Sequence, residues 1–492
     1  MSGATASMRH WFWLLLAFAF ALRLGAALAL PSIHQADEIF QTLEPAHLLW
    51  FEYGVVSWEW RLGIRSWLLP GLLAPVIGGA SALGMGPVGY QAVVAALMSL
   101  TSLSVVAVGV GFGARAYGRA GALLLGALGA VWFECVYFAP KTLTEVMAAH
   151  VLIIGVWLIH SAPRRLGLIG VLLGITFILR FHTAPMVFLA AIWICGADVK
   201  ARWPKLLAGA AIPLLFQALL DWATLGTPLQ SVWLNFWVNV VAARSDIYGV
   251  VPFYWYPGGL FLAWGGAFPL LIGAALLGAR RAPLLGWMVL VHLGAHSLIG
   301  HKELRFLYPI MPLLIVLAGL GLCRVLARLR GFAEAAPRVM APALVGICAV
   351  SLIGATNPGY IGNWRSLRGG LEATDFLRGQ EEICGIGVVN GPDWKGYWTP
   401  TGGYVRLHRD VPMYPGVDAA ALNALAPRFN YASLPRPVGD KLAGYARQHC
   451  WDFNIGGTIE ADDPEWCVYR RPGMCAPDPA AAINPALIQA DQ

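Results

Sequence analysis

The chain has 492 residues, of which 58% are hydrophobic and only 12% are charged. A soluble domain carries about 25% charged residues, so the composition excludes an ordinary soluble protein and indicates an integral membrane protein. The formal charge of +7 does not point to nucleic acid, because most Lys and Arg residues stand in short loops between apolar runs, as the positive-inside rule requires.

Eleven apolar runs are predicted to cross the membrane. The first, residues 11–30, is close to the roughly 20 residues that a span requires. No cleavage site followed by a soluble domain is apparent, so we expect a retained helix rather than a signal peptide. The other runs are residues 88–112, 120–138, 143–159, 166–179, 184–197, 206–220, 258–278, 284–299, 306–323 and 340–355.

The stretch 66–83 is ambiguous, because Pro70, Pro75 and several glycines interrupt it. Loop charge decides its topology. If it does not span, the basic residues around Arg115, Arg165 and Arg281 all face one side, which the positive-inside rule identifies as the cytoplasm. We therefore expect eleven spans, a cytoplasmic N-terminus and a re-entrant or juxtamembrane helix at 66–83.

Two short polar segments lie beside the apolar runs, at residues 34–38 and 301–305. Charges near spans cost several kcal/mol unless they face a cavity or a partner. Both segments fall on the outer side in the expected topology. We therefore predict that they contribute to one polar site at the outer membrane surface.

The first polar segment carries Asp37 and Glu38. General-base catalysis on a hydroxyl needs a carboxylate that is near the reacting group and partly shielded from water. The competing interpretation is an N-terminal helix cap with solvated acids. The second segment carries three ionisable groups beside His301, and its basic groups suit a phosphate at the headgroup level. The competing interpretation is snorkelling of Lys and Arg at a helix end.

The domain plan follows from changes in composition. We expect a transmembrane catalytic domain at 1–356, with a first outer loop at 31–87 and an aromatic outer loop at 221–257. A soluble outer domain is expected at 357–475 and a flexible tail at 476–492. Four cysteines fall in the outer domain, Cys384, Cys450, Cys467 and Cys475. Two disulfides are expected, and we favour Cys467 with Cys475 because Pro472 and Gly473 lie between them.

Four segments resemble glycosyltransferase family 22, the polytopic mannosyltransferases that use dolichyl-phosphate mannose. Residues 34–38 resemble H-P-D-E, residues 140–143 resemble P-R-T-L, residues 248–256 resemble Y-G-x-x-P-W-H-W-Y, and residues 301–307 resemble H-K-E-x-R-F-L. The chain departs from the family where Gln35 and Ala36 replace one proline, and where Phe253 and Tyr254 replace Trp-His. These departures are expected to alter acceptor choice.

The resemblance implies a GT-C fold: an α-helical polytopic protein with about 11 transmembrane helices, a helical first outer loop and a small C-terminal mixed α/β outer domain. It also implies an inverting transfer of mannose from a lipid-linked phosphate sugar to a glycan or glycolipid. Asp37 would accept the proton of the attacking hydroxyl, and Glu38 would orient a substrate. The residues expected to bind the donor phosphate are Arg65, His301, Lys302 and Arg305.

Further substrate-binding candidates under this resemblance are His34, Glu44, Glu59, Arg61, Lys141, Tyr248, Tyr256 and Glu303. No cofactor or metal is expected, because fixed cations can stabilise a single departing phosphate. The Ala-, Gly- and Arg-rich composition suggests a bacterial inner membrane protein with a periplasmic site and a polyprenyl donor; a eukaryotic chain would lie in the endoplasmic reticulum. The alternatives are a GT-C transferase for another sugar, or a transporter or flippase.

Overall fold

The computed structural model describes residues 2–389, 402–454 and 465–483. The chain folds as two compact units. The first unit comprises residues 1–26, 66–68 and 95–359, and the second comprises residues 27–65, 69–94 and 360–492. The first unit is the helical membrane part. The second combines the first outer loop with the C-terminal domain.

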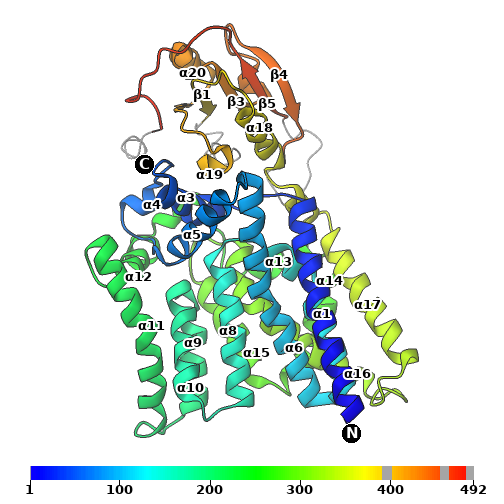
Figure 1. Cartoon of the computed structure of the whole chain (residues 1–492). Coiled ribbons are helices and arrows are strands. Elements are labelled where there is room, and N and C mark those ends of the chain that lie inside the picture. The colour runs from blue at the N-terminus through cyan, green and yellow to red at the C-terminus, as the bar shows by residue number, and fades with distance from the viewer. Residues whose placement is uncertain (1, 390–401, 455–464, 484–492) are drawn as a thin grey trace. The chain divides into compact units, whose positions relative to one another are not determined.

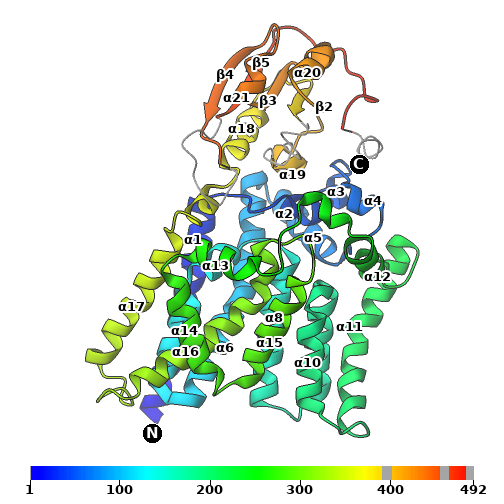
Figure 2. The same ribbon diagram turned by 180° about the vertical axis from the view of Figure 1, so that it is seen from behind.

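Long apolar helices dominate the first unit (Figures 1 and 2). Helix α9 packs against α8 and α11, α10 packs against α15, and α14 packs against α16. The helices are α1 (Ser2–Ala29), α6 (Pro87–Val131), α7 (Phe133–Phe138), α8 (Thr144–Ser161), α9 (Leu166–Leu179), α10 (Ala184–Cys195), α11 (Arg202–Leu225), α12 (Gln230–Phe236), α13 (Trp255–Trp264), α14 (Ala267–Ala279), α15 (Pro283–Ser297), α16 (Met311–Leu326) and α17 (Pro337–Ala355), with shorter turns η2 (Phe181–Thr183), η3 (Trp237–Val241), η4 (Arg244–Tyr248) and η5 (Leu304–Ile310).

Each of the eleven predicted spans contains helix. Two of them are the limbs of α6, which departs from helical dihedrals at Tyr117 and Gly118. Among the described residues, six helices are long and apolar enough to cross a membrane, or seven if α13 and α14, bent by 118°, form one span. Helices α9 and α10 are shorter than the roughly 20 residues of a full span. The chain is a multi-pass membrane protein, and the number eleven stays a prediction.

The stretch that the sequence left ambiguous forms α5 (Leu68–Ala82), with Pro75 inside the helix. Its 15 residues extend about 22 Å at 1.5 Å per residue. This length is below the roughly 30 Å of a bilayer core, and it agrees with a helix that does not span.

A buried arginine fixes the junction between α6 and α7. Arg23 of α1 is fully buried, and its guanidinium donates to the carbonyls of Gly129 at 2.8 Å and Cys135 at 3.4 Å. Carbonyls at the end of a helix lack intrahelical partners and carry the negative end of its dipole. Arg23 therefore satisfies the carbonyl of Gly129 where α6 ends.

Close helix packing in this unit depends on small residues. A Cβ on Gly278 of α14 would lie 1.9 Å from the Leu317 carbonyl of α16, and one on Gly321 of α16 would lie 1.8 Å from the Ala274 carbonyl. Membrane helices use such small residues to bring their backbones together.

The second unit has a helical part and a five-stranded sheet. Its elements are α2 (Ala36–Glu38), η1 (Ile39–Leu43), α3 (Glu44–Phe51), α4 (Trp58–Arg61), most of α5, η6 (Ile361–Arg365), α18 (Arg368–Arg378), β1 (Ile386–Val389), α19 (Gly403–Leu407), β2 (Met413–Gly416), α20 (Ala419–Leu425), η9 (Ala426–Arg428), β3 (Tyr431–Pro435), α21 (Arg436–Gly439), β4 (Ala446–Trp451) and β5 (Trp466–Arg470).

The sheet has the strand order β2-β1-β3-β5-β4. Strand β1 pairs in parallel with β2 and β3, whereas β5 pairs antiparallel with β3 and β4. Helix α18 packs against β3, β4 and β5 (Figure 1). The sheet and its helices confirm the mixed α/β outer domain that the family resemblance implied.

The tail differs in part from the expectation. The Ile483 amide donates to the Met413 carbonyl of β2 at 2.6 Å, and the Asp478 amide donates to the Tyr414 hydroxyl at 3.1 Å. Ala482 and Ile483 are buried. Residues 476–483 are therefore packed on the sheet rather than flexible, and the rest of the predicted tail lies outside the described residues.

All four outer cysteines form disulfides, as expected, but the favoured pairing is wrong. Cys450 is bonded to Cys467, and Cys384 is bonded to Cys475. Strands β4 and β5 place Cys450 and Cys467 directly opposite each other. Because Cys467 is held in β5 opposite Cys450, the turn that follows β5 does not bring Cys467 and Cys475 together.

The two disulfides are expected to contribute unequally to stability. Their sequence separations are 91 residues for Cys384–Cys475 and 17 for Cys450–Cys467. In the chain-entropy description the longer loop contributes about 4–5 kcal/mol and the shorter about 3 kcal/mol. Thermal unfolding of the full-length double Ser variants should show the larger loss for Cys384/Cys475, and equal losses would contradict this ranking.

Candidate active site

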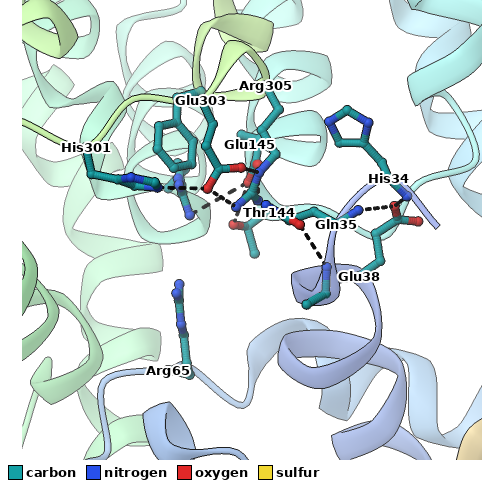
Figure 3. A network of polar contacts seen from close by, with 12 residues as sticks. His34, Gln35, Glu38, Arg65, Thr144, Glu145, His301, Glu303 and Arg305 are labelled. Carbon is teal, nitrogen blue, oxygen red and sulfur yellow. Dashed lines mark hydrogen bonds and ion pairs between the residues drawn. The ribbon is translucent and has the colours of Figure 1, made fainter. Parts of the chain in front are cut away.

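The acid pair starts the first helix of the outer loop. Gln35 is the N-cap of α2, and its side chain accepts a hydrogen bond from the Ala36 amide at 3.3 Å. The Glu38 carboxylate accepts hydrogen bonds from the His34 amide at 2.6 Å and, less closely, the Gln35 amide at 3.4 Å (Figure 3). This is a capping box. Glu38 is buried and holds the start of the helix together.

Asp37 is half-buried on the same turn. The capping box fixes the backbone of this turn on both sides of Asp37. A π-helix, η1, follows directly, and π-helical turns occur frequently at functional sites. The arrangement gives Asp37 a rigid support with partial access to solvent, as a general base needs.

The next part of the outer loop packs onto η1. The Trp60 indole donates to the Phe40 carbonyl at 2.9 Å. Glu59 and Arg65 form an ion pair with each other, and Arg61 is half-buried on α4. In this structure the Arg65 charge is therefore shared with Glu59. Its assignment to the donor phosphate stays a prediction, as do those of Glu59 and Arg61.

Glu44 joins the outer loop to the C-terminal domain within the second unit. Its fully buried carboxylate accepts hydrogen bonds from the amides of Val55 at 2.9 Å, Tyr404 at 3.2 Å and Val405 at 2.9 Å. Burial raises the pKa of Glu44 to about 7, although these amides act in the opposite direction. Two of the amides belong to the first turn of α19, where a negative group is favoured.

The approach of α19 to Glu44 requires a glycine. Gly403 has φ +69°, and a Cβ there would lie 2.6 Å from Glu44 Oε2. Beside it, His47 Nε2 lies 3.2 Å from His408 Nδ1. Glu44 is therefore a structural link within the second unit, and its assignment to the substrate stays a prediction.

Replacing Glu44 should loosen this link. Glu44→Ala leaves three buried amides without their acceptor, at a cost of about 1–3 kcal/mol for each unsatisfied group. Limited proteolysis of the full chain should then release the C-terminal domain faster than in wild type. The exposed neighbour Glu52 provides the matched control as Glu52→Ala, and identical proteolysis of the two variants would refute the role of Glu44.

The second polar segment forms a charge network in the membrane unit (Figure 3). Arg305 donates from Nη1 to Glu145 at 2.8 Å, from Nε to Glu303 at 2.7 Å and from Nη2 to Glu303 at 3.2 Å. Glu303 also lies 3.1 Å from His301 Nε2. Arg180 lies 3.7 Å from Glu145. Arg305 and Glu145 are almost completely buried.

Lys302 has a different environment. Its ammonium donates to the carbonyls of Val251 at 2.9 Å, Ile299 at 2.5 Å and Gly300 at 3.4 Å. An ammonium has three N–H groups, so these carbonyls account for all of them. Lys302 therefore ties the aromatic outer loop to the turn after α15, and it offers a phosphate its charge but no N–H group in this arrangement.

The remaining predicted residues of this unit lie around the network or apart from it. The Tyr248 ring lies 5.8 Å from the His301 ring, and Tyr256 is fully buried at the start of α13. Lys141 is buried, with its ammonium 5.1 Å from the centre of the Tyr137 ring. The structure thus places Tyr248 against the network and Lys141 against an aromatic ring.

Sequence reasoning missed two members of the network, Glu145 and Arg180. Glu145 stands in an apolar run that was treated as a span, and an acid in such a position is itself a functional signal. Arg180 stands at the end of α9 and lies against the ring of Phe306, 5.3 Å from its centre. The rarity of basic residues on the predicted outer side could have identified it.

A small gap beside Arg305 has room for about one water molecule. Its lining includes Glu134, Tyr308, Leu304, Leu307 and Met311 as well as Arg305.

The described parts of the chain offer few groups of side chains that could bind a metal ion. There, the one group of three His, Cys, Asp or Glu ligands close enough for an ion is Cys450, Glu465 and Cys467. The two cysteines form a disulfide with each other, so this group does not fit a metal. The expectation that no metal is required stays a prediction.

Comparisons with known proteins identify the family of the chain. The model of the Alg9-like mannosyltransferase family matches residues 11–357. GPI mannosyltransferase 3 of Yarrowia lipolytica is 27% identical over 80% of this chain and 75% of its own length. GPI alpha-1,2-mannosyltransferase 3 of Homo sapiens is 27% identical over 63% of this chain, but only 57% of the human protein is covered.

A solved structure supports the fold. ArnT from Cupriavidus metallidurans, bound to undecaprenyl phosphate, superimposes with a TM-score of 0.56 over 95% of this chain and 99% of its own. The sequences are only 12% identical, so this likeness concerns the fold alone. It confirms the GT-C architecture that the sequence resemblance implied.

Proposed function

Because the chain belongs to the Alg9-like mannosyltransferase family and is a membrane mannosyltransferase with a GT-C fold, we propose that it transfers mannose from a lipid-linked phosphate donor to a glycan or glycolipid. The transfer inverts the anomeric centre. The observation that carries this proposal is the network in which Arg305, Arg180 and His301 meet Glu145 and Glu303.

The donor proposal follows from the chemistry of this network. A lipid-linked phosphate sugar has an anionic phosphodiester next to a long hydrocarbon chain. Arginine recognises phosphate through parallel N–H groups, and the bilayer around the membrane helices can accommodate the hydrocarbon chain. ArnT, which has a similar fold, was solved with bound undecaprenyl phosphate. This supports a polyprenyl donor for this chain.

The acceptor side of the proposal rests on the acid pair. Asp37 accepts the proton of the acceptor hydroxyl as that oxygen attacks the anomeric carbon. The bond from this carbon to the phosphate oxygen breaks, and its electron pair remains on the lipid phosphate. Fixed cations stabilise the charge that develops there. Glu38 keeps Asp37 in place through the capping box.

The names of the relatives bear on the acceptor. The human and Yarrowia proteins are GPI mannosyltransferases, but this chain has Phe253 and Tyr254 where the family has Trp-His. We propose a mannose-containing glycan or glycolipid as the acceptor class, and we do not restrict it to GPI.

A donor assay tests the proposal. Purified full-length protein should transfer label from short-chain polyprenyl-phosphate mannose to a membrane lipid extract. It should not use GDP-mannose, since the leaving group in the proposed reaction is a lipid phosphate and not a nucleoside diphosphate. Transfer from GDP-mannose alone would refute the lipid donor, and transfer only from another polyprenyl-phosphate sugar would refute mannose.

A further inference from the structure

His301 is the residue of the charge network whose charge can change near neutral pH. Its Nδ1 lies 3.1 Å from the Gly249 carbonyl, and its Nε2 lies 3.1 Å from Glu303 Oε1. Neutral imidazole has one N–H group and imidazolium has two. A backbone carbonyl can only accept, so both contacts are hydrogen bonds at the same time if the ring is protonated and Glu303 is ionised.

Arg305 donates to both oxygens of Glu303, so both oxygens act as acceptors, as those of a carboxylate do. The hydrogen bond from His301 to Glu303 raises the pKa of His301, whereas burial and the Arg305 charge act against this rise. The pKa of His301 is raised, which means that the folded protein stabilises its charged form. The charge is present at low pH and is lost as the pH rises through the elevated pKa.

The other charged groups around His301 have both signs. The cations are Arg180, Lys302 and Arg305, together with Arg244 of η4. The carboxylates are Glu145, Glu303 and Asp246, whose charge acts on Lys302. The rings of Tyr248 and Phe306 pack against His301 and are uncharged. The proton of His301 thus adds one positive charge to a group of mixed sign.

We propose that Gly249 and Glu303 hold His301 as an imidazolium, and that its charge recruits the phosphate of the lipid-linked donor. This inference rests on the proposed function. A phosphodiester stays monoanionic around neutral pH, so a pH-dependent affinity for it must come from the protein. The leaving phosphate monoester has a second pKa of about 6, and the same imidazolium faces the charge that it gains.

The test is the pH dependence of KM for the polyprenyl-phosphate mannose donor, measured with the full-length protein between about pH 5.5 and 8.5. In wild type, KM should stay low at acidic pH and rise roughly 10-fold as His301 loses its proton, the order expected for the loss of one nearby unit charge without a direct hydrogen bond to the phosphate. H301Q should have the high KM at every pH. H301R should keep the low KM into the alkaline range, and kcat should change less than KM.

His160 gives the matched control, since its Nδ1 contacts the Val156 carbonyl within its own helix, α8. H160Q should follow the wild-type profile. A pH-independent KM in wild type, or an H301Q profile like that of wild type, would overturn the inference while donor turnover still upholds the proposed function. If H301Q does not fold, H301R provides the test. A KM of H301R that rises at the same pH as that of wild type would overturn the inference. Loss of all lipid-donor turnover in wild type would refute the proposed function instead.

Discussion

Asp37→Asn is expected to abolish mannosyl transfer while the protein still folds. The amide has the shape of the carboxylate but cannot accept the proton of the attacking hydroxyl. Removal of a general base costs about 10²- to 10⁴-fold in rate. The capping box that supports this turn uses Gln35 and Glu38, not the Asp37 side chain, so the helix start should persist. The measurement is kcat with the lipid donor, together with thermal stability.

Two further variants separate chemistry from structure. Glu38→Gln keeps an oxygen that can accept the His34 amide, and we expect it to retain most of the transfer activity. Asp198→Asn is the matched control, because Asp198 caps the Ala201 amide in an exposed loop. If Asp37→Asn turned over normally while Glu38→Gln were inactive, the roles of the two acids would be exchanged. Activity in both would refute a carboxylate base.

The fold could be predicted from the sequence to the extent that it depends on local patterns. Apolar runs identified the helices, and the change in composition near residue 357 identified an outer domain, whose mixed α/β character the family resemblance implied. The disulfide pairing could not be predicted, because it depends on which strands are neighbours. Cys450 and Cys467 meet across β4 and β5, and no local spacing encodes that pairing.

The candidate site was predictable where charges stand out from an apolar background. His301, Glu303 and Arg305 were identified in this way, and the structure joins them in one network. Glu145 and Arg180 were missed because each appears alone in its segment. Glu44 was assigned to the substrate because it lies close in sequence to the acid pair Asp37 and Glu38. Its long-range bond to α19 is invisible in the sequence.

Arg305 has two roles that a single substitution would confuse. Its guanidinium neutralises Glu145 and Glu303, and we propose that it also stabilises the departing lipid phosphate. Arg305→Gln leaves a buried carboxylate with a weaker partner, and breaking a buried ion pair costs about 3–5 kcal/mol. Arg180 lies 3.7 Å from Glu145 and should reduce this loss. We therefore expect a destabilised and inactive protein.

The double variant Glu145→Gln/Arg305→Gln separates the two roles. Two neutral amides can hydrogen-bond in place of the ion pair, so thermal stability should largely return. Activity should not return, because the leaving phosphate still lacks its cation, and kcat/KM for the donor should stay about 100-fold or more below wild type. Arg324→Gln, an exposed arginine near the end of α16, should leave both measurements unchanged. Recovery of activity together with stability in the double variant would show that Arg305 acts only on the carboxylates, and the phosphate role would then pass to Arg180 and His301.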